Sequence, residues 1–168
     1  MLTIRDRSEG GAWRKREARR LELYRRGFDI VSAIDIEIAA PSARLLAAAA
    51  HRHRVKVISS FHDFAGTPSL NRLLAVVRRG RRLGADVVKI ATMVKEPHDL
   101  ARLFAVPALA KGPICVLGMG EQGDVSRIAL PCAGSCLAYG AVGTATAPGQ
   151  WSCSRLAKEL KRWGARMD

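Results

Sequence analysis

The sequence predicts an α/β fold built from parallel strand–helix units, arranged either as a doubly wound sheet or as a barrel. Three observations support this prediction. Short apolar runs alternate with helix-like runs, the units recur about every 25 residues, and no low-complexity linker interrupts them. We therefore expect a single domain over residues 1–168.

Six short runs rich in β-branched and apolar residues have the character of strands, and a helical run follows each of them. The expected strands are Leu2–Arg5, Ile30–Ile38, Val55–Ser60, Val87–Ala91, Ile114–Leu117 and Ser135–Tyr139. The expected helices are Ala12–Arg26, Ala43–His51, Ser69–Leu83, Pro97–Leu109, Val125–Pro131 and Ser152–Trp163. Gly27, Gly84 and Gly112 follow helical runs and can end them in the left-handed conformation.

The composition is that of a chain that can build a core, because 48% of its residues are hydrophobic. No apolar run nears the roughly 20 residues that a bilayer crossing needs. Charged residues occupy the positions where a secretory signal would be apolar. We therefore expect a cytoplasmic protein without a membrane partner.

The chain is basic, with 28 Lys+Arg against 15 Asp+Glu and a formal net charge of +13. A helix that binds nucleic acid would use such cations on phosphates. The alternative is the solvated face of an amphipathic helix, with Ala18, Leu21 and Tyr24 facing inward. We favour the second interpretation and expect no specific nucleic-acid partner, because Glu17 and Glu22 interrupt the basic residues. The basic residues of this segment are Arg14, Lys15, Arg16, Arg19, Arg20, Arg25 and Arg26.

Metal and dinucleotide sites are not expected. The four cysteines form no C-x-x-C pair and are expected to be small buried side chains. Residues 118–123 match G-x-G-x-x-G, but the acidic residue that a dinucleotide site needs about 20 residues later is absent. A tight glycine turn that approaches an anionic or polar ligand fits this segment better.

Lys89 is the most informative residue, because it interrupts an otherwise apolar strand. Burial disfavours its ammonium form, and a neutral amine in a dry pocket is a Schiff-base nucleophile. Two alternatives remain open: the lysine extends from the strand end into solvent, or it pairs with Asp35 or Glu37.

Three further residues are candidates by position. Asp35 and Glu37 are two apart on a strand, so they share one face, where they could tune a buried lysine or lie exposed at an edge. His62 lies at the carboxyl rim of the third strand. A histidine there is suited to proton transfer, although a surface or capping role is the alternative.

The ordered set of motifs resembles type I 3-dehydroquinate dehydratase, the Schiff-base family of the shikimate pathway. The resemblance covers almost the whole chain, and it is the combination of motifs that is specific. The matching segments are Thr3-Ile4-Arg5 with Glu9-Gly10-Gly11, Ile34-Asp35-Ile36-Glu37, Ser60-Phe61-His62-Asp63-Phe64 with Thr67-Pro68, Asp86-Val87-Val88-Lys89-Ile90-Ala91, Met119-Gly120 with Ser126-Arg127, and Ala145-Thr146-Ala147-Pro148-Gly149-Gln150.

The resemblance implies a role for each matching residue. Lys89 would form an iminium with the substrate ketone, His62 would move the proton, and Asp35 or Glu37 would orient and polarise His62 or the lysine. The substrate, 3-dehydroquinate, would lose water to give 3-dehydroshikimate, without a metal or a diffusible cofactor. The substrate-binding residues would be Arg5, Glu9, Met119, Arg127, Thr146 and Gln150.

The resemblance also implies a (β/α) TIM-type barrel that is incomplete here, with about six of the eight usual units. The first two units would be absent, which would leave two open strand edges. We expect a homodimer or other self-association. The alternatives to a dehydratase are an inactive remnant that acts as an interaction module and another Schiff-base barrel lyase or aldolase.

Overall fold

The computed structural model describes residues 1–144 and 150–165. The fold divides into two compact units. The first comprises Met1–His62 and Ala75–Lys89, and the second comprises Asp63–Leu74 and Ile90–Asp168.

Five of the six expected strands are present. They are β1 (Leu2–Thr3), β2 (Ala33–Glu37), β3 (Lys56–Asp63), β4 (Val87–Met93) and β5 (Ile114–Met119). Their order in the sheet is β1-β2-β3-β4-β5, and both β1–β2 and β2–β3 pair in parallel. This confirms an α/β fold. No pairing among the described residues closes the sheet into a barrel, so the barrel and its missing units stay predictions.

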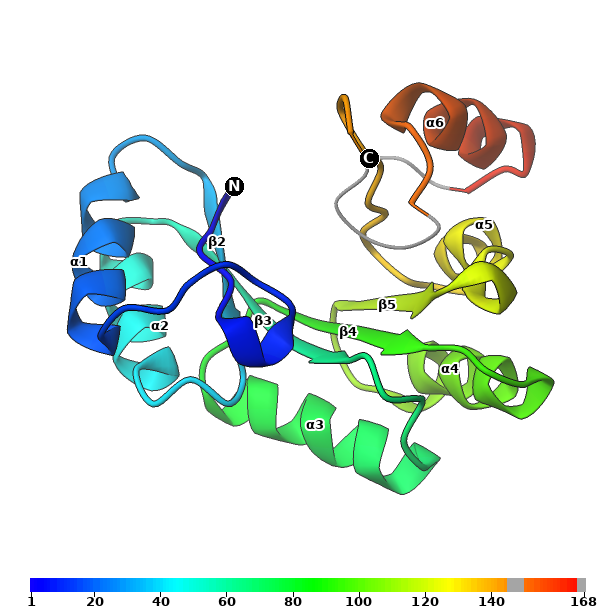
Figure 1. Cartoon of the computed structure of the whole chain (residues 1–168), viewed down its shortest axis with the longest axis horizontal. Coiled ribbons are helices and arrows are strands. Elements are labelled where there is room, and N and C mark those ends of the chain that lie inside the picture. The colour runs from blue at the N-terminus through cyan, green and yellow to red at the C-terminus, as the bar shows by residue number, and fades with distance from the viewer. Residues whose placement is uncertain (145–149, 166–168) are drawn as a thin grey trace. The chain divides into compact units, whose positions relative to one another are not determined.

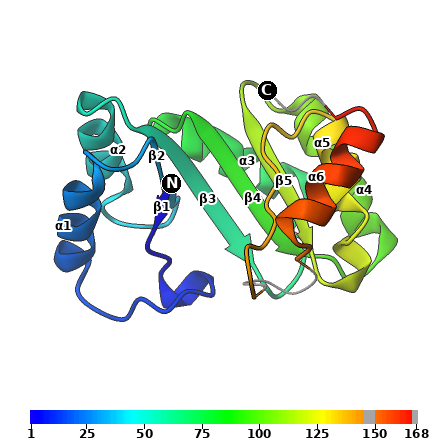
Figure 2. The ribbon, with the colours of Figure 1, turned by 90° about the horizontal axis from the view of Figure 1, so that it is seen from above.

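In the first unit, α1 (Glu17–Gly27) and α2 (Ala43–Arg52) pack side by side next to β2 (Figures 1 and 2). Ile34 and Ile36 of β2 belong to the core that these helices cover. Because side chains alternate along a strand, Asp35 and Glu37 project from the opposite face. A short 3-10 turn, η1 (Arg7–Glu9), follows β1.

The second unit contains α4 (Pro97–Leu109), β5, the 3-10 turn η2 (Glu121–Gly123), α5 (Ser126–Cys132) and α6 (Cys153–Arg162). Helix α3 (Leu70–Arg82) begins in this unit and ends in the first. Helices α5 and α6 lie side by side (Figure 1). The Ser126 hydroxyl accepts a hydrogen bond of 2.9 Å from the Gly118 N–H, which ties the start of α5 to β5.

Three expectations about secondary structure are wrong. Ser135–Tyr139 is not a strand: the Ser135 hydroxyl accepts the Val116 N–H at 2.9 Å, so a side chain takes the place of a ladder carbonyl. The first helix starts at Glu17 rather than Ala12, because backbone bonds between Trp13 and the Arg5–Arg7 segment hold the chain extended there. Gly27 is the last residue of α1 rather than a left-handed cap.

Gly84 and Gly112 do adopt the left-handed conformation, with φ of 92° and 80°, as expected. None of the helices in the described residues combines the length and apolar character that a membrane crossing requires. Within the same residues, no group of three or more His, Cys, Asp or Glu side chains has the arrangement of a metal site.

Candidate active site

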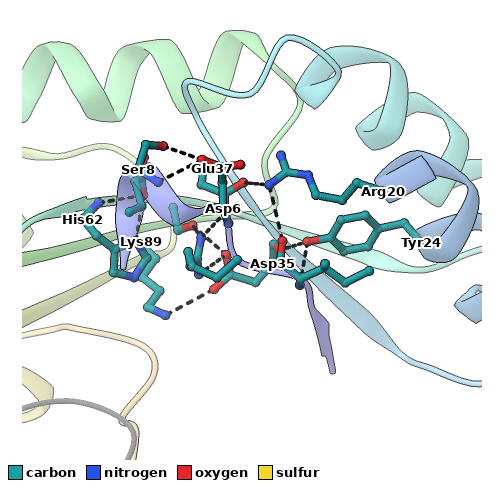
Figure 3. A network of polar contacts seen from close by, with 12 residues as sticks. Asp6, Ser8, Arg20, Tyr24, Asp35, Glu37, His62 and Lys89 are labelled. Atoms are coloured by element: carbon teal, nitrogen blue, oxygen red, sulfur yellow. Dashed lines mark hydrogen bonds and ion pairs between the residues drawn. The ribbon is translucent and has the colours of Figure 1, made fainter. Parts of the chain in front are cut away.

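Six of the predicted site residues lie together in the first unit, in a network of hydrogen bonds and ion pairs. Figure 3 labels four of them, Asp35, Glu37, His62 and Lys89. They come from the β1–η1 segment, from β2, from the end of β3 and from β4. Parallel strands bring their carboxyl ends to one edge, which explains why segments so far apart in sequence meet here. The six residues are Arg5, Glu9, Asp35, Glu37, His62 and Lys89.

Asp35 lies at the centre of this network. Its carboxylate is 2.8 Å from Nη2 of Arg5 and 3.2 Å from Nζ of Lys89, and it accepts a 2.6 Å hydrogen bond from the Ser60 hydroxyl. Burial alone would raise the pKa of Asp35, but the charges of Lys89 and Arg5 outweigh it and hold this pKa below its ordinary value. Asp35 is therefore an anion at neutral pH beside the lysine.

Lys89 is buried on β4, as its place in an apolar strand indicated, and 8% of the residue is exposed. Its ion pair with Asp35 matches one of the two alternatives that the sequence left open. The carboxylate of Asp35 is a counter-ion for the lysine inside the fold. The lysine is thus held in place next to a counter-ion rather than in a purely apolar pocket.

His62 is the penultimate residue of β3, and its contact with Glu9 could not be foreseen. Nδ1 of the ring lies 2.8 Å from Oε2 of Glu9, and the backbone N–H of His62 donates to the same oxygen at 2.9 Å. The sequence suggested Asp35 or Glu37 as the carboxylate that orients His62 or the lysine. Asp35 contacts the lysine, whereas the carboxylate that holds the histidine is Glu9.

The Glu9–His62 pair has displaced pKa values. Burial raises the pKa of Glu9 to about 7. Burial and the positive charges of Arg5 and Lys89 lower the pKa of His62 to about 3. At neutral pH the imidazole is therefore uncharged, which is the state in which it can accept a proton.

Glu37 lies between two guanidinium groups. Its Oε1 is 3.2 Å from Nη1 of Arg5 and accepts the Asp6 N–H at 2.8 Å, and its Oε2 is 2.9 Å from Nη1 of Arg20. The burial of Arg20, of which 2% is exposed, corrects the expectation that it belongs to a solvated basic face. Tyr24, in contrast, faces inward as predicted.

The charges of the network alternate along a chain of contacts. Each cation touches an anion and each anion a cation, so the buried charge is balanced. In order, the chain runs Lys89, Asp35, Arg5, Glu37, Arg20 and Glu17.

Three other predicted residues lie in the second unit. Met119 ends β5, Arg127 lies in the first turn of α5, and Gln150 precedes Trp151. Asp124 joins two of these segments, because its Oδ1 lies 3.5 Å from Nε of Arg127 and accepts a 2.6 Å hydrogen bond from the Trp151 indole. Thr146 lies outside the described residues.

Burial lowers the pKa of Arg127, although Asp124 opposes this effect. Next to this contact is a hollow of about 490 Å³ lined by Trp151 and by polar and charged residues of the same unit. Gln150 and Asp124 both contribute to its wall. The second unit therefore carries a recess of mixed polar and apolar character beside two of the predicted substrate-binding residues.

The backbone geometry explains why glycine occupies two positions of the first motif, Gly10 and Gly11. Gly10 has a φ of 81°, which L side chains rarely adopt. A Cβ on Gly11 would lie 1.9 Å from the carbonyl oxygen of Arg5. The turn that carries Glu9 to His62 therefore requires glycine at both positions.

The sequence pattern of the family described as Type I 3-dehydroquinase matches residues 1–165. A 3-dehydroquinate dehydratase of Thermodesulfovibrio yellowstonii is 37% identical over 168 residues, which span 99% of this chain and 73% of that protein. One of Klebsiella pneumoniae is 36% identical, over 93% of this chain and 66% of that protein.

Solved structures of 3-dehydroquinate dehydratases are also similar to this chain. A 3-dehydroquinate dehydratase of Geobacillus kaustophilus superposes with a TM-score of 0.91 at 27% identity, over 99% of this chain and 68% of that one. A type I enzyme of Clostridium difficile, solved with covalently modified comenic acid, gives 0.88 at 31% identity over 95% and 66% of the two chains. The chain belongs to the type I 3-dehydroquinase family.

Proposed function

We propose that this chain removes water from 3-dehydroquinate to give 3-dehydroshikimate, through a covalent imine between Lys89 and the substrate ketone. A hydro-lyase of the shikimate pathway, which leads to the aromatic amino acids, is the function of the family to which the chain belongs. The observation that supports the covalent route best is the buried amine of Lys89, 3.2 Å from the Asp35 carboxylate.

In the first half of the reaction, the neutral amine of Lys89 attacks the ketone carbon, and the carbonyl oxygen leaves as water after taking up one proton, which the final hydrolysis returns. The resulting iminium carries a positive charge, which the neighbouring Asp35 carboxylate stabilises. The iminium withdraws electrons from the adjacent C–H bond and makes that proton acidic. No diffusible cofactor or metal ion is part of the proposal, because the iminium itself is the electron sink.

In the second half, Nε2 of His62 takes the proton while Nδ1–H donates to Glu9. The enamine then expels the hydroxyl group, which leaves as water with the proton that His62 returns. Hydrolysis of the product iminium consumes one water and frees Lys89, so the net change is the loss of one water from the substrate.

The remaining predicted residues bind the substrate in this proposal. Arg5 and Arg127 offer guanidinium groups, which suit a carboxylate and hydroxyl groups. Glu9, through its contact with His62, acts in proton transfer in addition to any contact with the substrate. Met119, Thr146 and Gln150 complete the binding set. We also infer a cytoplasmic, self-associating enzyme, whose assembly sedimentation velocity would measure.

Borohydride trapping tests the covalent route. The chain is incubated with 3-dehydroquinate and sodium borohydride, digested and analysed by mass spectrometry. The expected result is a reduced adduct on Lys89 that disappears in Lys89→Ala. An exposed lysine at the first position of β3 gives the control: Lys56→Ala should still form the adduct at Lys89.

A second variant separates imine formation from proton transfer. His62→Ala should still form the adduct but dehydrate the substrate about 100-fold more slowly or worse. Failure of the folded wild type to form any adduct contradicts the proposal and favours an inactive remnant. An adduct only with other keto-sugars would instead identify a different Schiff-base lyase.

A further inference from the structure

Two side chains of α1 reach the ends of β1 and β2 behind the candidate site. Arg20 and Tyr24 are four residues apart, so they project from the same face of the helix. They are 2% and 0% exposed, and Figure 3 shows both directed toward the site residues of β2. A buried guanidinium is costly unless specific partners compensate it, so its contacts define what it does.

The contacts of Arg20 link the helix to the backbone before Arg5 and to Glu37. Its Nη1 lies 2.9 Å from Oε2 of Glu37 and donates to the Ile4 carbonyl at 3.3 Å, while Nε lies 3.0 Å from Glu17. Glu37 would otherwise be a buried carboxylate with Arg5 as its counter-ion. Arg20 gives Glu37 a second counter-ion, on the carboxylate oxygen that Arg5 does not contact.

Tyr24 bridges the two strands themselves. Its hydroxyl accepts the Ile4 N–H at 3.0 Å and donates to the Asp35 carbonyl at 2.7 Å. The parallel ladder between β1 and β2 ends at the pair Thr3 and Asp35, so the phenol continues the connection where the strands separate. Two residues beyond Thr3, the Arg5 side chain contacts the Asp35 carboxylate at 2.8 Å.

We propose that Arg20 and Tyr24, together called the α1 clamp, are positioning residues that hold the Arg5 guanidinium between Asp35 and Glu37. The inference rests on the proposed function, in which Arg5 binds the substrate. The α1 clamp acts through the backbone of Ile4 and through Glu37 rather than on the reacting atoms. Its loss should therefore raise KM more than it lowers kcat, because Arg5 is no longer preorganised for the substrate.

Tyr24→Phe keeps the ring and its packing and removes only the bridging hydroxyl. The change removes both hydrogen bonds of the hydroxyl, and a loss of about 1 kcal/mol in the positioning of Arg5 corresponds to a rise in KM of about fivefold, with kcat changed by less than about twofold. Arg20→Met should raise KM about tenfold or more. Arg20→Lys should give a smaller rise, because it restores the charge but one ammonium cannot replace the guanidinium fork.

Arg19→Met is the matched control for these variants. Arg19 neighbours Arg20 on α1, but half of its side chain is exposed and its partner is the surface residue Glu22. Loss of the Arg19 side chain should leave KM unchanged. An Arg20→Met variant that folds and matches Arg19→Met in KM overturns the inference.

A double-mutant cycle distinguishes positioning from a general structural role. In a Glu37→Gln background, Arg20→Met should change KM by less than about twofold, because the two residues are coupled. A purely structural role lowers the active fraction, which the borohydride adduct counts, and so lowers kcat without raising KM. That outcome contradicts the inference.

The Ile4 amide provides a readout that needs no substrate. Its N–H donates to Tyr24, so its hydrogen exchange should accelerate about fivefold or more in Tyr24→Phe. Unchanged exchange would overturn the clamp even if the enzyme were active. A wild type that forms no adduct contradicts the proposed function, whereas an adduct with unaltered KM in the folded variants contradicts the clamp alone.

Discussion

One carboxylate oxygen of Glu9 holds His62 at two points, the backbone N–H at 2.9 Å and ring Nδ1 at 2.8 Å. When Glu9 is ionised, it accepts the Nδ1 proton, and the lone pair of Nε2 is available as a base. When Glu9 is protonated, it donates to Nδ1, and the remaining ring proton blocks Nε2. In the proposed mechanism, the protonation of Glu9 would therefore determine whether His62 can act as the base.

The rate of dehydration should depend on pH with an acid limb near 7. The pKa of Glu9 is raised to about 7 and that of His62 is lowered to about 3, so Glu9 is the group that titrates in this range. Activity should increase as the pH rises through about 7. The pH profile of kcat/KM measures this, and a limb near 3 instead would assign the titration to His62.

Glu9→Gln should remove that acid limb. The amide does not titrate and holds the ring without a charge, so we expect kcat about 100-fold lower and flat between pH 5 and 8. Borohydride trapping on Lys89 should persist, because imine formation does not require the His62 base. If Glu9→Gln keeps the acid limb of the wild-type pH profile, a group other than Glu9 controls that limb.

Asp35→Asn should destabilise the fold as well as slow the reaction. Removing the carboxylate leaves Arg5 and Lys89 as buried cations with reduced compensation, which typically costs about 3 kcal/mol of unfolding free energy. Because the pKa of Asp35 is lowered in the fold, the wild-type advantage should be present at neutral pH and vanish as the pH falls well below about 4. Urea unfolding at several pH values measures both effects.

The surface residue Asp29 supplies the comparison for Asp35. Its side chain is 88% exposed, and its neighbour is His53, 3.6 Å away. Asp29→Asn should change the unfolding free energy by no more than about 0.5 kcal/mol. An equal loss of unfolding free energy in Asp29→Asn and Asp35→Asn would mean that the buried network adds nothing to stability.

Gly11→Ala should displace the site without touching a charged group. The added Cβ would lie 1.9 Å from the Arg5 carbonyl oxygen, so the backbone around Arg5 must move. A shift of about 1 Å in a binding group can reduce kcat/KM by about 100-fold. Gly66→Ala is the control, since a Cβ there meets no atom within 4 Å and should leave kcat/KM unchanged.

Asp86→Asn should affect stability and leave catalysis intact. Asp86 precedes β4 and accepts the Val57 N–H at 2.8 Å, and it pairs with His51 and Lys56 at the amino ends of the strands. Weakening this cluster should cost about 1 kcal/mol, seen as a lower melting temperature. A large fall in kcat/KM would show that the two ends of the strands are coupled.

The sequence predicted the strands that bear the candidate site residues better than it predicted the segments between these strands. Lys89 is recognisable because a cation in the run Val87–Ala91 contradicts the rest of the strand, and Asp35 and Glu37 because their spacing places them on one face. Ser135–Tyr139 has the composition of a strand but not its pairing, because one serine hydroxyl replaces a ladder carbonyl. The composition of a segment cannot reveal that a side-chain hydroxyl will accept a hydrogen bond in place of a backbone carbonyl.

The partners of the site residues depend on tertiary structure and were not predictable. Glu9 reaches His62 because η1 places two residues that are 53 apart in sequence within hydrogen-bond distance. Arg20 resembles its basic neighbours in sequence, and only the buried Glu37 distinguishes it. A glutamate three residues earlier, Glu17, was the one local signal that Arg20 could be paired.

The alternating chain of buried charges has a consequence for the proposed covalent cycle. An ammonium and an iminium each bear one positive charge at nearly the same place, so exchanging one for the other leaves Asp35 and the groups behind it in the same field. The protein need not reorganise when the substrate becomes attached. The same carboxylate, that of Asp35, would thus be the counter-ion both before and after the substrate is attached.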